Sequence, residues 1–505
     1  MKIAYTPSQS LSGGRVILLF LLFFLALYEF IVSGFPVFAA ICMVPVLVIV
    51  AILTFRQGML AFWALMVVNY FVQWKNFPNI GLPTSIPNEM LEILLLIMAI
   101  IDVQGQKFER ALNIMFFALI IWASFCTLEV LNDTCGLGIQ IGPWYTGARM
   151  LAFQLIYAHL VYVIYIKDSD RLVRYLYFWG ILALFAAFWV WKQQHIGMTQ
   201  AENSFLYGRG RSTHVINGGA TIRLFSVFGD AANFGCGIAA TAVAFLIFGI
   251  TAKVRKYKRF FMIVGLICTW AMFPSGTRSA QFVLFAGFAA YVVLSKSFKI
   301  AIPVGIAFVL VYVFLAFTTI GNGNAQIRRM RSGFNKDDAS ANQRTINQAI
   351  MKKYLADAPW GLGVGLGYDN VPSNNKYRKL ATIAPDSEYV FVWIHTGYVG
   401  ITIFLITTLM IFGGASWIVL FRLRSPSLQG IGAGFTCAFA GIQLGGYANQ
   451  VLMQYPNCLI FYGGVSLVFV LPLIEKDWMA HEEKQLAIEA EKKRIKEEKK
   501  RAKRV

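Results

Sequence analysis

The stretch 384–405, APDSEYVFVWIHTGYVGITIFL, sets two carboxylates, Asp386 and Glu388, directly before a long apolar run. A run of this length is typical of a helix that crosses a membrane, because about 20 residues span the hydrocarbon core. The two carboxylates then stand at the mouth of a membrane helix. What they do there depends on the side of the membrane that they face.

The composition of the whole chain points to the same class of protein. Of the 505 residues, 57% are hydrophobic and only 14% are charged. A soluble domain this apolar could not cover its surface with polar groups, so the sequence predicts an all-α protein that crosses the membrane many times. The net charge of +20 fits basic cytoplasmic loops. Because no nucleic-acid-binding motif accompanies this charge, we expect no nucleic acid partner.

Windows of about 20 residues predict about fourteen transmembrane helices. These are 15–34, 36–54, 58–75, 88–103, 110–130, 150–166, 172–191, 231–252, 260–274, 278–295, 299–320, 389–421, 429–449 and 456–474. No small-residue cleavage site follows the first run, so it is interpreted as an uncleaved helix. The charged stretch 475–505 is predicted to be a solvated cytoplasmic helix with i,i+4 ion pairs.

Alternate connections between these helices are basic, as the positive-inside rule expects of cytoplasmic loops. Examples are the connections around Lys107 and Arg110, and around Arg255. This alternation places both termini in the cytoplasm and the long connections 192–230 and 321–388 outside. The predicted organisation is one polytopic domain, 1–474, which includes both outer loops, followed by the tail 475–505.

The two long outer loops break the charge rule. The first includes Arg209, Arg211 and Arg223, and the second has ten basic residues, Arg344 among them. Long loops cross the membrane largely regardless of charge, so ordinary surface charge is one interpretation. The other interpretation is an external site for an anionic, phosphate-bearing ligand.

The second outer loop contains a predicted amphipathic helix that begins after Asp338 and runs to about residue 356. Ile346, Ile350 and Tyr354 share one face, and Arg344 lies on another. Pro359 and the glycines at 361, 363, 365 and 367 end this helix in a turn that we expect to be flexible.

Arginines mark the outer ends of two predicted spans. Arg278, in SGTRSA (275–280), lies just inside one span, where an unpaired Arg costs about 3 kcal/mol unless it reaches the interface. At that depth it can meet a lipid-linked phosphate. In RLFSVFGDAANF (223–234), Asp230 is a predicted N-cap with Asn233 in the first turn. Arg223 has no such structural explanation.

The carboxylates of the opening stretch have two explanations. Negative charge at a helix N-terminus is favoured by the helix dipole, and Asp386 or Ser387 can serve as a simple N-cap. Alternatively, a carboxylate acts as a general base. His395, two turns further along, is interpreted as a buried polar residue that pairs with a neighbouring helix.

In this order, the segments RLFSVFGDAANF, SGTRSA, DAPWGLGVGLG and APDSEYVFVWIHTGYVGI resemble the O-antigen ligase and polymerase superfamily of bacterial inner-membrane glycosyltransferases. The resemblance covers roughly 140–425. It implies a GT-C-like all-α membrane fold and a metal-independent, inverting glycosyl transfer on the periplasmic side, without a cofactor. The implied donor is an oligosaccharide on undecaprenyl pyrophosphate, and a hydroxyl of an acceptor glycan attacks its anomeric carbon.

The resemblance also implies roles for individual residues. Arg223 and Arg278 match arginines that stabilise the departing pyrophosphate, and Arg344 is a weaker match. Ligases place His-Asn before the Tyr of the last motif; aligned on Tyr389, these positions are Asp386 and Ser387 here. Either Asp386 takes the place of the base, or deprotonation needs no dedicated base. We expect substrate contacts from Arg344, Asn233, Arg209, Arg211, Glu388 and Tyr389.

The missing His favours a polymerase of O-antigen, capsule or exopolysaccharide repeat units over a ligase that joins glycan to lipid A–core. A transporter of lipid-linked oligosaccharide is a further alternative. It predicts charged or broken segments at mid-membrane and a repeat that relates two halves, and neither is evident in the sequence. Other polysaccharide-assembly proteins are expected partners. The seven Cys show no CxxC pair or clustered Cys/His spacing, so no metal site is predicted.

Overall fold

The structure is a computed structural model that describes residues 24, 58–77, 85–101, 108–216, 221–296, 298–323, 327–328, 331, 339–383 and 385–502. The predicted spans 15–34 and 36–54 lie outside these residues, apart from residue 24. The chain divides into two compact units, 1–63 and 64–505. The second unit contains every predicted site residue.

Helices make up nearly all of the regular structure in the described ranges. They are α3 (Gly58–Phe71), α4 (Ile86–Ile101), α5 (Ile114–Leu128), α6 (Ile141–Ala148), α7 (Gln154–Tyr165), α8 (Ser169–His195), α9 (Gln200–Tyr207), α10 (Arg211–His214), α11 (Ala231–Thr251), α12 (Arg255–Ala271), α13 (Arg278–Ser295), α14 (Phe298–Phe317), α16 (Ala339–Leu355), α17 (Arg378–Thr382), α18 (Glu388–Trp417), α19 (Pro426–Ala448), α20 (Asn457–Val468) and α21 (Leu471–Ala502). A short antiparallel pair, β1 (Val215–Ile216) and β2 (Thr221–Ile222), interrupts the first outer loop.

The predicted spans from residue 58 onward each overlap a helix of this structure. Within the described residues, six helices are long and apolar enough to cross a membrane, and α20 with α21 makes a seventh if the bent pair is one span. An all-α membrane protein is therefore consistent with the structure. The number fourteen stays a prediction.

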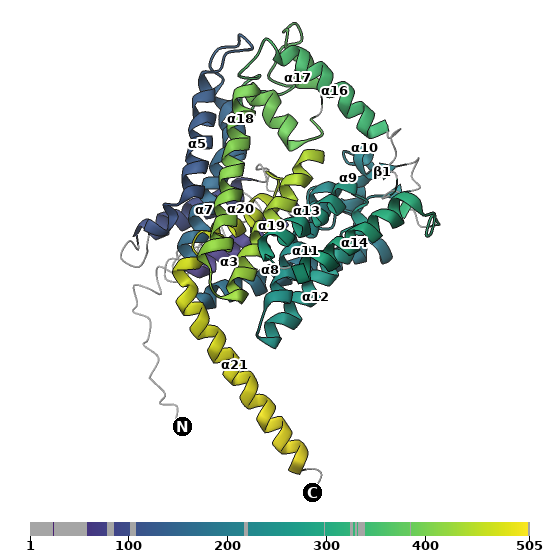
Figure 1. Cartoon of the computed structure of the whole chain (residues 1–505). Helices are drawn as coiled ribbons and strands as arrows, with labels where there is room; N and C mark the ends of the chain where they lie inside the picture. The colour runs from purple at the N-terminus through teal and green to yellow at the C-terminus, as the bar shows by residue number, and fades with distance from the viewer. Residues whose placement is uncertain are drawn as a thin grey trace. The chain divides into compact units, whose positions relative to one another are not determined.

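The helix α11 lies at the centre of the second unit and packs against α12, α13 and α19 (Figure 1). The side chain of Asp230 caps it by accepting hydrogen bonds from the backbone N–H groups of Ala232 and Asn233, at 2.7 and 2.9 Å. The predicted N-cap is thus confirmed. Glycines along α11 let neighbours approach closely, since Gly235 faces Ser275.

The last predicted span, 456–474, is wrong in its boundary. The helix α20 ends at Val468, and α21 begins at Leu471 after a bend of 80°. The physical reason is Pro472, which has no N–H to continue the ladder of α20 but suits the first turn of a new helix. The tail helix therefore starts four residues earlier than the predicted boundary at 475.

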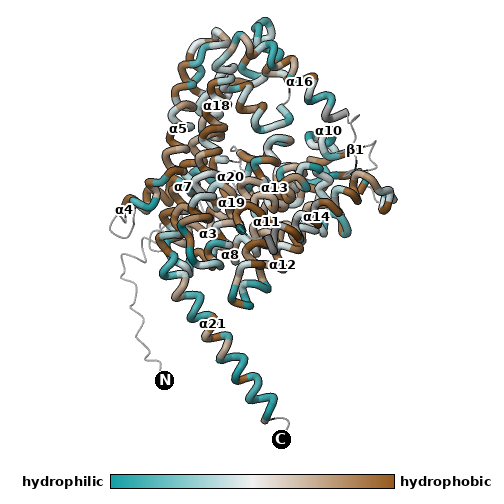
Figure 2. Tube along the Cα trace, viewed as in Figure 1, coloured by the Kyte–Doolittle hydropathy of each residue, from teal (hydrophilic) through white to brown (hydrophobic). Residues whose placement is uncertain are grey.

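Carboxylates of α21 cap the ends of three other helices. Asp477 accepts from the backbone N–H of Ser169 at α8 (2.8 Å), Glu489 from that of Lys256 at α12 (3.0 Å), and Glu475 from that of Ser425 at α19 (2.8 Å). The far part of α21 is exposed and hydrophilic (Figure 2). The predicted tail helix is thus fastened to the bundle over its first half.

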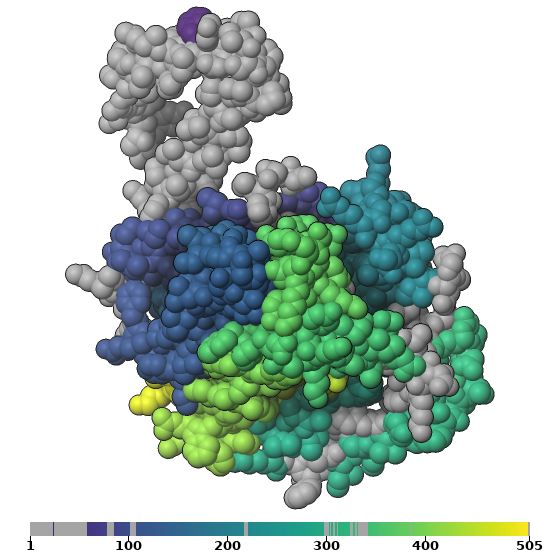
Figure 3. Space-filling model, turned by 90° about the horizontal axis from the view of Figure 1, so that it is seen from above, coloured from purple at the N-terminus to yellow at the C-terminus, as the bar shows by residue number. Residues whose placement is uncertain are grey.

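The segment predicted to be the second outer loop shares a hydrophobic cluster with the start of α18. Met351 and Leu355 of α16 pack with Leu362, Leu366 and Ile394. The predicted apolar face is therefore only partly right: Ile346 is 54% exposed, because only the C-terminal half of α16 is covered. The predicted cap, Asp338, lies outside the described residues. Seen from above, the green segment that contains α18 lies beside the blue segment that contains α5 (Figure 3).

The glycine turn after α16 is fixed rather than loose. The backbone N–H groups of Leu362 and Gly363 donate to the carbonyl oxygens of Ile394 and His395, at 2.9 and 3.0 Å. The backbone of Gly361 packs directly against that of Gly397, since a Cβ on Gly361 would lie 2.5 Å from the nitrogen of Gly397. Gly397 has a positive φ of 63° and marks a kink in α18. Gly365 meets the backbone of α6. The turn thus joins α18 to α6 and sets the direction in which α18 begins.

Replacement of Gly365 by Ala is expected to lower the free energy of unfolding by about 1–3 kcal/mol. Gly365 has a φ of +84°, and a Cβ there would meet the carbonyl of Pro143. Gly367→Ala is the matched control, since the nearest heavy atom to its Cβ is Asn370 Oδ1 at 3.9 Å. Thermal unfolding of the detergent-solubilised variants tests this difference, and equal melting temperatures would contradict it.

Candidate active site

A cavity of about 720 Å³ lies in the second unit, where the segment after α3, the start of α11, the start of α18 and the segment before α20 come together. Its polar lining includes Gln73, Lys75, Arg209, Asp230, Glu388 and Gln454. Aromatic side chains, among them Trp74 and Phe205, line the rest. The cavity thus offers both charged groups and apolar ring faces.

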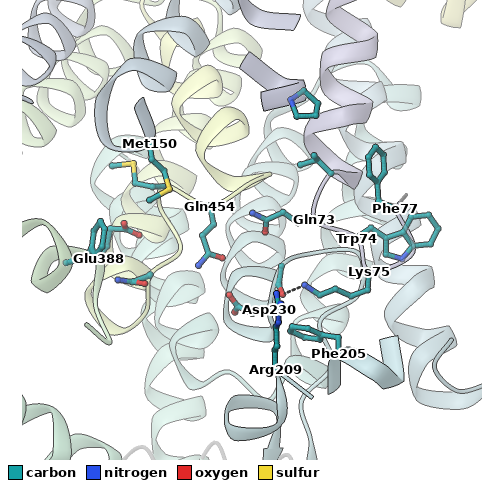
Figure 4. A pocket seen from close by; sticks show the side chains of 16 residues that line it. Gln73, Trp74, Lys75, Phe77, Met150, Phe205, Arg209, Asp230, Glu388 and Gln454 are labelled. Carbon is teal, nitrogen blue, oxygen red and sulfur yellow. Dashed lines mark hydrogen bonds between the residues drawn. The ribbon is translucent and has the colours of Figure 1, made fainter. Parts of the chain in front are cut away.

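Charged groups occupy two opposite sides of this cavity. Figure 4 shows Lys75, Arg209 and Asp230 on one side, and Glu388 beside Met150 on the other. Gln73 and Gln454 lie between the two groups. We call these the basic side and the carboxylate side. A ligand that fills the cavity therefore meets two cations and the carboxylate of Asp230 at one end, and the carboxylate of Glu388 at the other.

Lys75 is the most constrained cation of the basic side. Its ammonium donates to the carbonyl of Gly229 at 2.9 Å and stands 3.9 Å from the ring centre of Phe205. Burial lowers the pKa of Lys75 from its ordinary value to about 8, against the opposing attraction of Asp230. A partly desolvated ammonium binds an anion more strongly than an exposed one, because solvent screens it less.

The motifs around Arg223 and Arg278 meet beside the start of α11. The guanidinium of Arg223 donates to the hydroxyl of Thr277 at 2.7 Å and to the carbonyls of Thr213 (3.0 Å) and Ser275 (3.3 Å). The Thr277 hydroxyl in turn donates to the carbonyl of Ala231 at 2.9 Å. These bonds tie the first outer loop to the starts of α11 and α13.

Arg278, the first residue of α13, is half-buried and lies within electrostatic reach of Arg223. Two guanidinium groups are therefore gathered at one place, which favours a multiply charged anion between or beside them. Neither is among the described residues that line the cavity. Arg223 lies within electrostatic reach of Asp230, which lines the cavity.

The two carboxylates of the opening stretch have different surroundings. Glu388 is only 2% exposed, lines the cavity, and accepts a hydrogen bond from the backbone N–H of Leu452 at 3.0 Å. The Asp386 side chain is 48% exposed, and its Oδ2 lies 4.0 Å from Nε of Arg344. Of the two, Glu388 is the carboxylate that faces the cavity.

The remaining predicted site residues are distributed around this site. Asn233 is fully buried, where its amide donates to the carbonyl of Tyr455 at 2.7 Å and braces α11 against the segment before α20. The Tyr389 hydroxyl donates to Oε1 of Gln443 at 2.9 Å. Arg209 lines the cavity, whereas Arg211 is exposed at the start of α10.

Arg344 reaches across to the end of α19, where it donates to the carbonyl of Ala448 at 2.9 Å. It thus links α16 to α19 and stands next to Asp386. Among the described residues, His395 pairs with the glycine turn and not with a neighbouring helix: its Nδ1 lies 3.2 Å from the carbonyl of Gly363. That interpretation is therefore corrected: His395 fixes the turn.

Sequence reasoning missed Lys75 and Gln73 on the cavity wall. The sequence did contain a signal for them: the polar stretch QWKN (73–76) stands at the end of an apolar run, just as Arg278 stands at the start of another. It also missed an ion pair between Glu89 of α4 and Arg149, in which Nε and Oε1 lie 3.1 Å apart. Both residues stand within or beside predicted spans.

Residues 263–405 match a family model described as O-antigen ligase. The matched range contains Arg278, Arg344, Asp386 and Glu388. The match supports the placement of the chain in the superfamily of O-antigen ligases and polymerases, whose members are glycosyltransferase-like membrane proteins. A search of the curated proteins gives no match.

Proposed function

We propose that the protein transfers a glycan from undecaprenyl pyrophosphate to a hydroxyl of an acceptor sugar, and that it polymerises repeat units of O-antigen, capsule or exopolysaccharide. The family match supports a reaction of the ligase and polymerase type. The observation in the structure that carries the proposal is the cavity with a basic side and a carboxylate side. The reaction inverts the anomeric centre and needs no metal.

In the proposed reaction, the bond between the anomeric carbon and the phosphate oxygen breaks as the acceptor oxygen forms its bond to that carbon. The leaving diphosphate gains negative charge, and preorganised cations stabilise it in the transition state. Lys75 and Arg209 supply cations inside the cavity, with Arg223 and Arg278 beside it.

The acceptor hydroxyl loses its proton during the attack. Glu388 is the proposed acceptor of this proton, because it is the carboxylate that lines the cavity opposite the basic side. Backbone N–H groups of the segment before α20, that of Leu452 at 3.0 Å among them, hold this carboxyl group in place. The pair of Asp386 and Arg344, which sequence alone put at the centre, then lies at the approach to the site.

A ligase is the second candidate, because the matching family model is described by that activity. Complementation separates the two activities. A host without its polymerase leaves single repeats on lipid A, and a host without its ligase leaves polymer on the lipid carrier. We expect the protein to restore a glycan ladder in the polymerase-null host; restoration only in the ligase-null host would overturn the polymerase proposal.

The proposed orientation puts both termini in the cytoplasm and the two outer loops in the periplasm of an inner-membrane protein. Cys introduced at the exposed Lys353 should react with an impermeant maleimide in cells with a permeabilised outer membrane, while Cys at Lys500 should not. The six described native cysteines are buried, so the unmodified protein gives the background. Labelling at Lys500 but not Lys353 would reverse the orientation and remove the proposed site from the periplasm.

The cation at Lys75 predicts a pH dependence. With a pKa of about 8, Lys75 is charged at neutral pH and loses its charge as the pH rises through about 8, so transfer should fall over that range. Lys75→Arg keeps its charge at every working pH and should move this fall to higher pH. Lys379→Arg, at an exposed position, is the control. If transfer falls at the same alkaline pH in the wild type and in Lys75→Arg, Lys75 is not the group that causes the fall.

A further inference from the structure

Next to residues that line the cavity lies a second group of polar side chains, which the proposed reaction does not use. Asn88, Glu89 and Glu92 share one face of α4, at spacings of three and four residues. The helix α4 packs against α7. Pro87 and Met150, the direct neighbours of Asn88 and Arg149, line the cavity. This polar cluster therefore adjoins the cavity wall.

The cluster contains one close pair of opposite charges. Nε of Arg149 lies 3.1 Å from Oε1 of Glu89, and the two side chains are 12% and 9% exposed. Neither of these two atoms makes a hydrogen bond within the described part of the chain, so both keep capacity for another partner. Arg149 also opens a π-helical segment, Arg149–Phe153, between α6 and α7. Such segments are rare and recur at functional sites.

Around this pair, several buried polar groups have no partner within the described residues. Asn88 and Glu92 are fully buried, and neither amide atom of Asn88 and neither carboxyl oxygen of Glu92 is hydrogen-bonded. The same holds for Oε1 of Gln154 and the hydroxyl of Tyr455. Tyr455 lies within electrostatic reach of Glu92, Glu89 and Arg149. Buried polar groups in native proteins are nearly always paired, and an exception points to a site that receives a partner.

The chemistry of the cluster selects among ligand classes. Its carboxyl groups disfavour a phosphate, and the guanidinium of Arg149 disfavours a metal cation. Donors and acceptors are both present, in Arg149 and Asn88 on one hand and in Glu89, Glu92 and Gln154 on the other. A neutral ligand with many hydroxyls satisfies both kinds at once. That description fits a sugar.

We propose that Asn88, Glu89, Glu92 and Arg149 form a sugar-binding subsite that takes hydroxyl groups of the glycan on the lipid diphosphate. The inference rests on the proposed function and adds an orientation to it. Met150 lies beside Glu388 and opposite Lys75, so the glycan points to the carboxylate side while its diphosphate lies at the basic side (Figure 4). Glu89 and Arg149 contact the sugar first, past the flexible side chains of Met150 and Met453.

The test compares two ligands in lipid nanodiscs. One is bare undecaprenyl pyrophosphate, and the other is the pool of lipid-linked oligosaccharides extracted from the host bacterium. The double variant E89Q/R149M removes both charges of the pair together, so that no unpaired charge stays buried. We expect it to weaken binding of the glycan-bearing lipid by about tenfold or more, and binding of the bare lipid by less than about twofold.

The control is the double variant D357N/K376M, which removes an exposed ion pair of 2.7 Å whose two residues do not line the cavity. It should bind both lipids as wild type does. If the melting temperature shows that E89Q/R149M does not fold, the near-isosteric variant Glu92→Gln replaces it in the same comparison of lipid binding. It should show the same selective loss, because the amide cannot reproduce the carboxyl group.

The outcomes separate the two proposals. Equal weakening of both lipids, or no weakening of either, overturns the sugar subsite while the proposed function stands. Failure of the wild type to bind either lipid overturns the proposed function itself. Selective loss of the glycan-bearing lipid supports both.

Discussion

Replacement of Arg278 or Arg223 by Ala should reduce glycan transfer by about 10²–10³-fold, the usual cost of removing one preorganised donor from a developing charge. Both guanidinium groups lie at the starts of α11 and α13, beside the cavity. The lipid diphosphate leaves with added charge, and each arginine contributes most after the bond has begun to break. The loss should therefore appear in kcat more than in KM.

The two arginine variants should differ in their effect on the stability of the fold. Arg223 donates to Thr213, Ser275 and Thr277, so its loss also leaves buried acceptors unpaired and should lower the melting temperature. The variant Arg223→Lys keeps a charge but loses the forked geometry, and it should recover stability poorly. Transfer assayed in proteoliposomes, beside thermal unfolding, separates the two effects.

Lys379→Ala is the control for these arginine variants, since it removes an exposed cation from the second predicted outer loop. It should transfer glycan at the wild-type rate. Wild-type rates for both Arg223→Ala and Arg278→Ala would remove the arginines from the reaction. The cavity cations Lys75 and Arg209 would then have to stabilise the leaving group alone.

Glu388→Gln should lower kcat by about 10²–10⁴-fold, the range that a general base contributes. The amide keeps the shape of the side chain and still accepts the hydrogen bond from Leu452, so folding should be preserved. Asp386→Asn should cost less than about tenfold, because Asp386 is 48% exposed and only 4.0 Å from Arg344 at its nearest atoms.

This ranking reverses the one that sequence alone suggests, in which Asp386 stands where ligases of the superfamily keep a His. A larger loss in Asp386→Asn than in Glu388→Gln would restore the original ranking. The paired variants assayed at one saturating donor concentration decide between the two carboxylates.

Apolar run length predicted where helices form, and it did so closely for α13, whose bounds Arg278–Ser295 equal the predicted span. The cap at Asp230 was also predictable, because capping depends on neighbours only two and three residues away. The break between α20 and α21 was missed, since the hydropathy window averages across Pro472.

The site depends on contacts that no local pattern encodes. Arg223 and Thr277 are 54 positions apart, yet share a hydrogen bond of 2.7 Å. Glu388 and Leu452 are 64 positions apart. Two carboxylates separated by one residue therefore looked alike in sequence, and only tertiary packing distinguished a buried one from an exposed one. The role of each arginine stays a prediction.

The capping of α8, α12 and α19 by α21 has a consequence for biogenesis. The ribosome delivers those three helices before α21, so the backbone N–H groups of Ser169, Lys256 and Ser425 lack these carboxylate partners until α21 has been made. Insertion of these helices therefore comes before their hydrogen bonds to α21 can form. A chain released before residue 475 would lack all three carboxylates, and the starts of α8, α12 and α19 would each lose a hydrogen-bond acceptor.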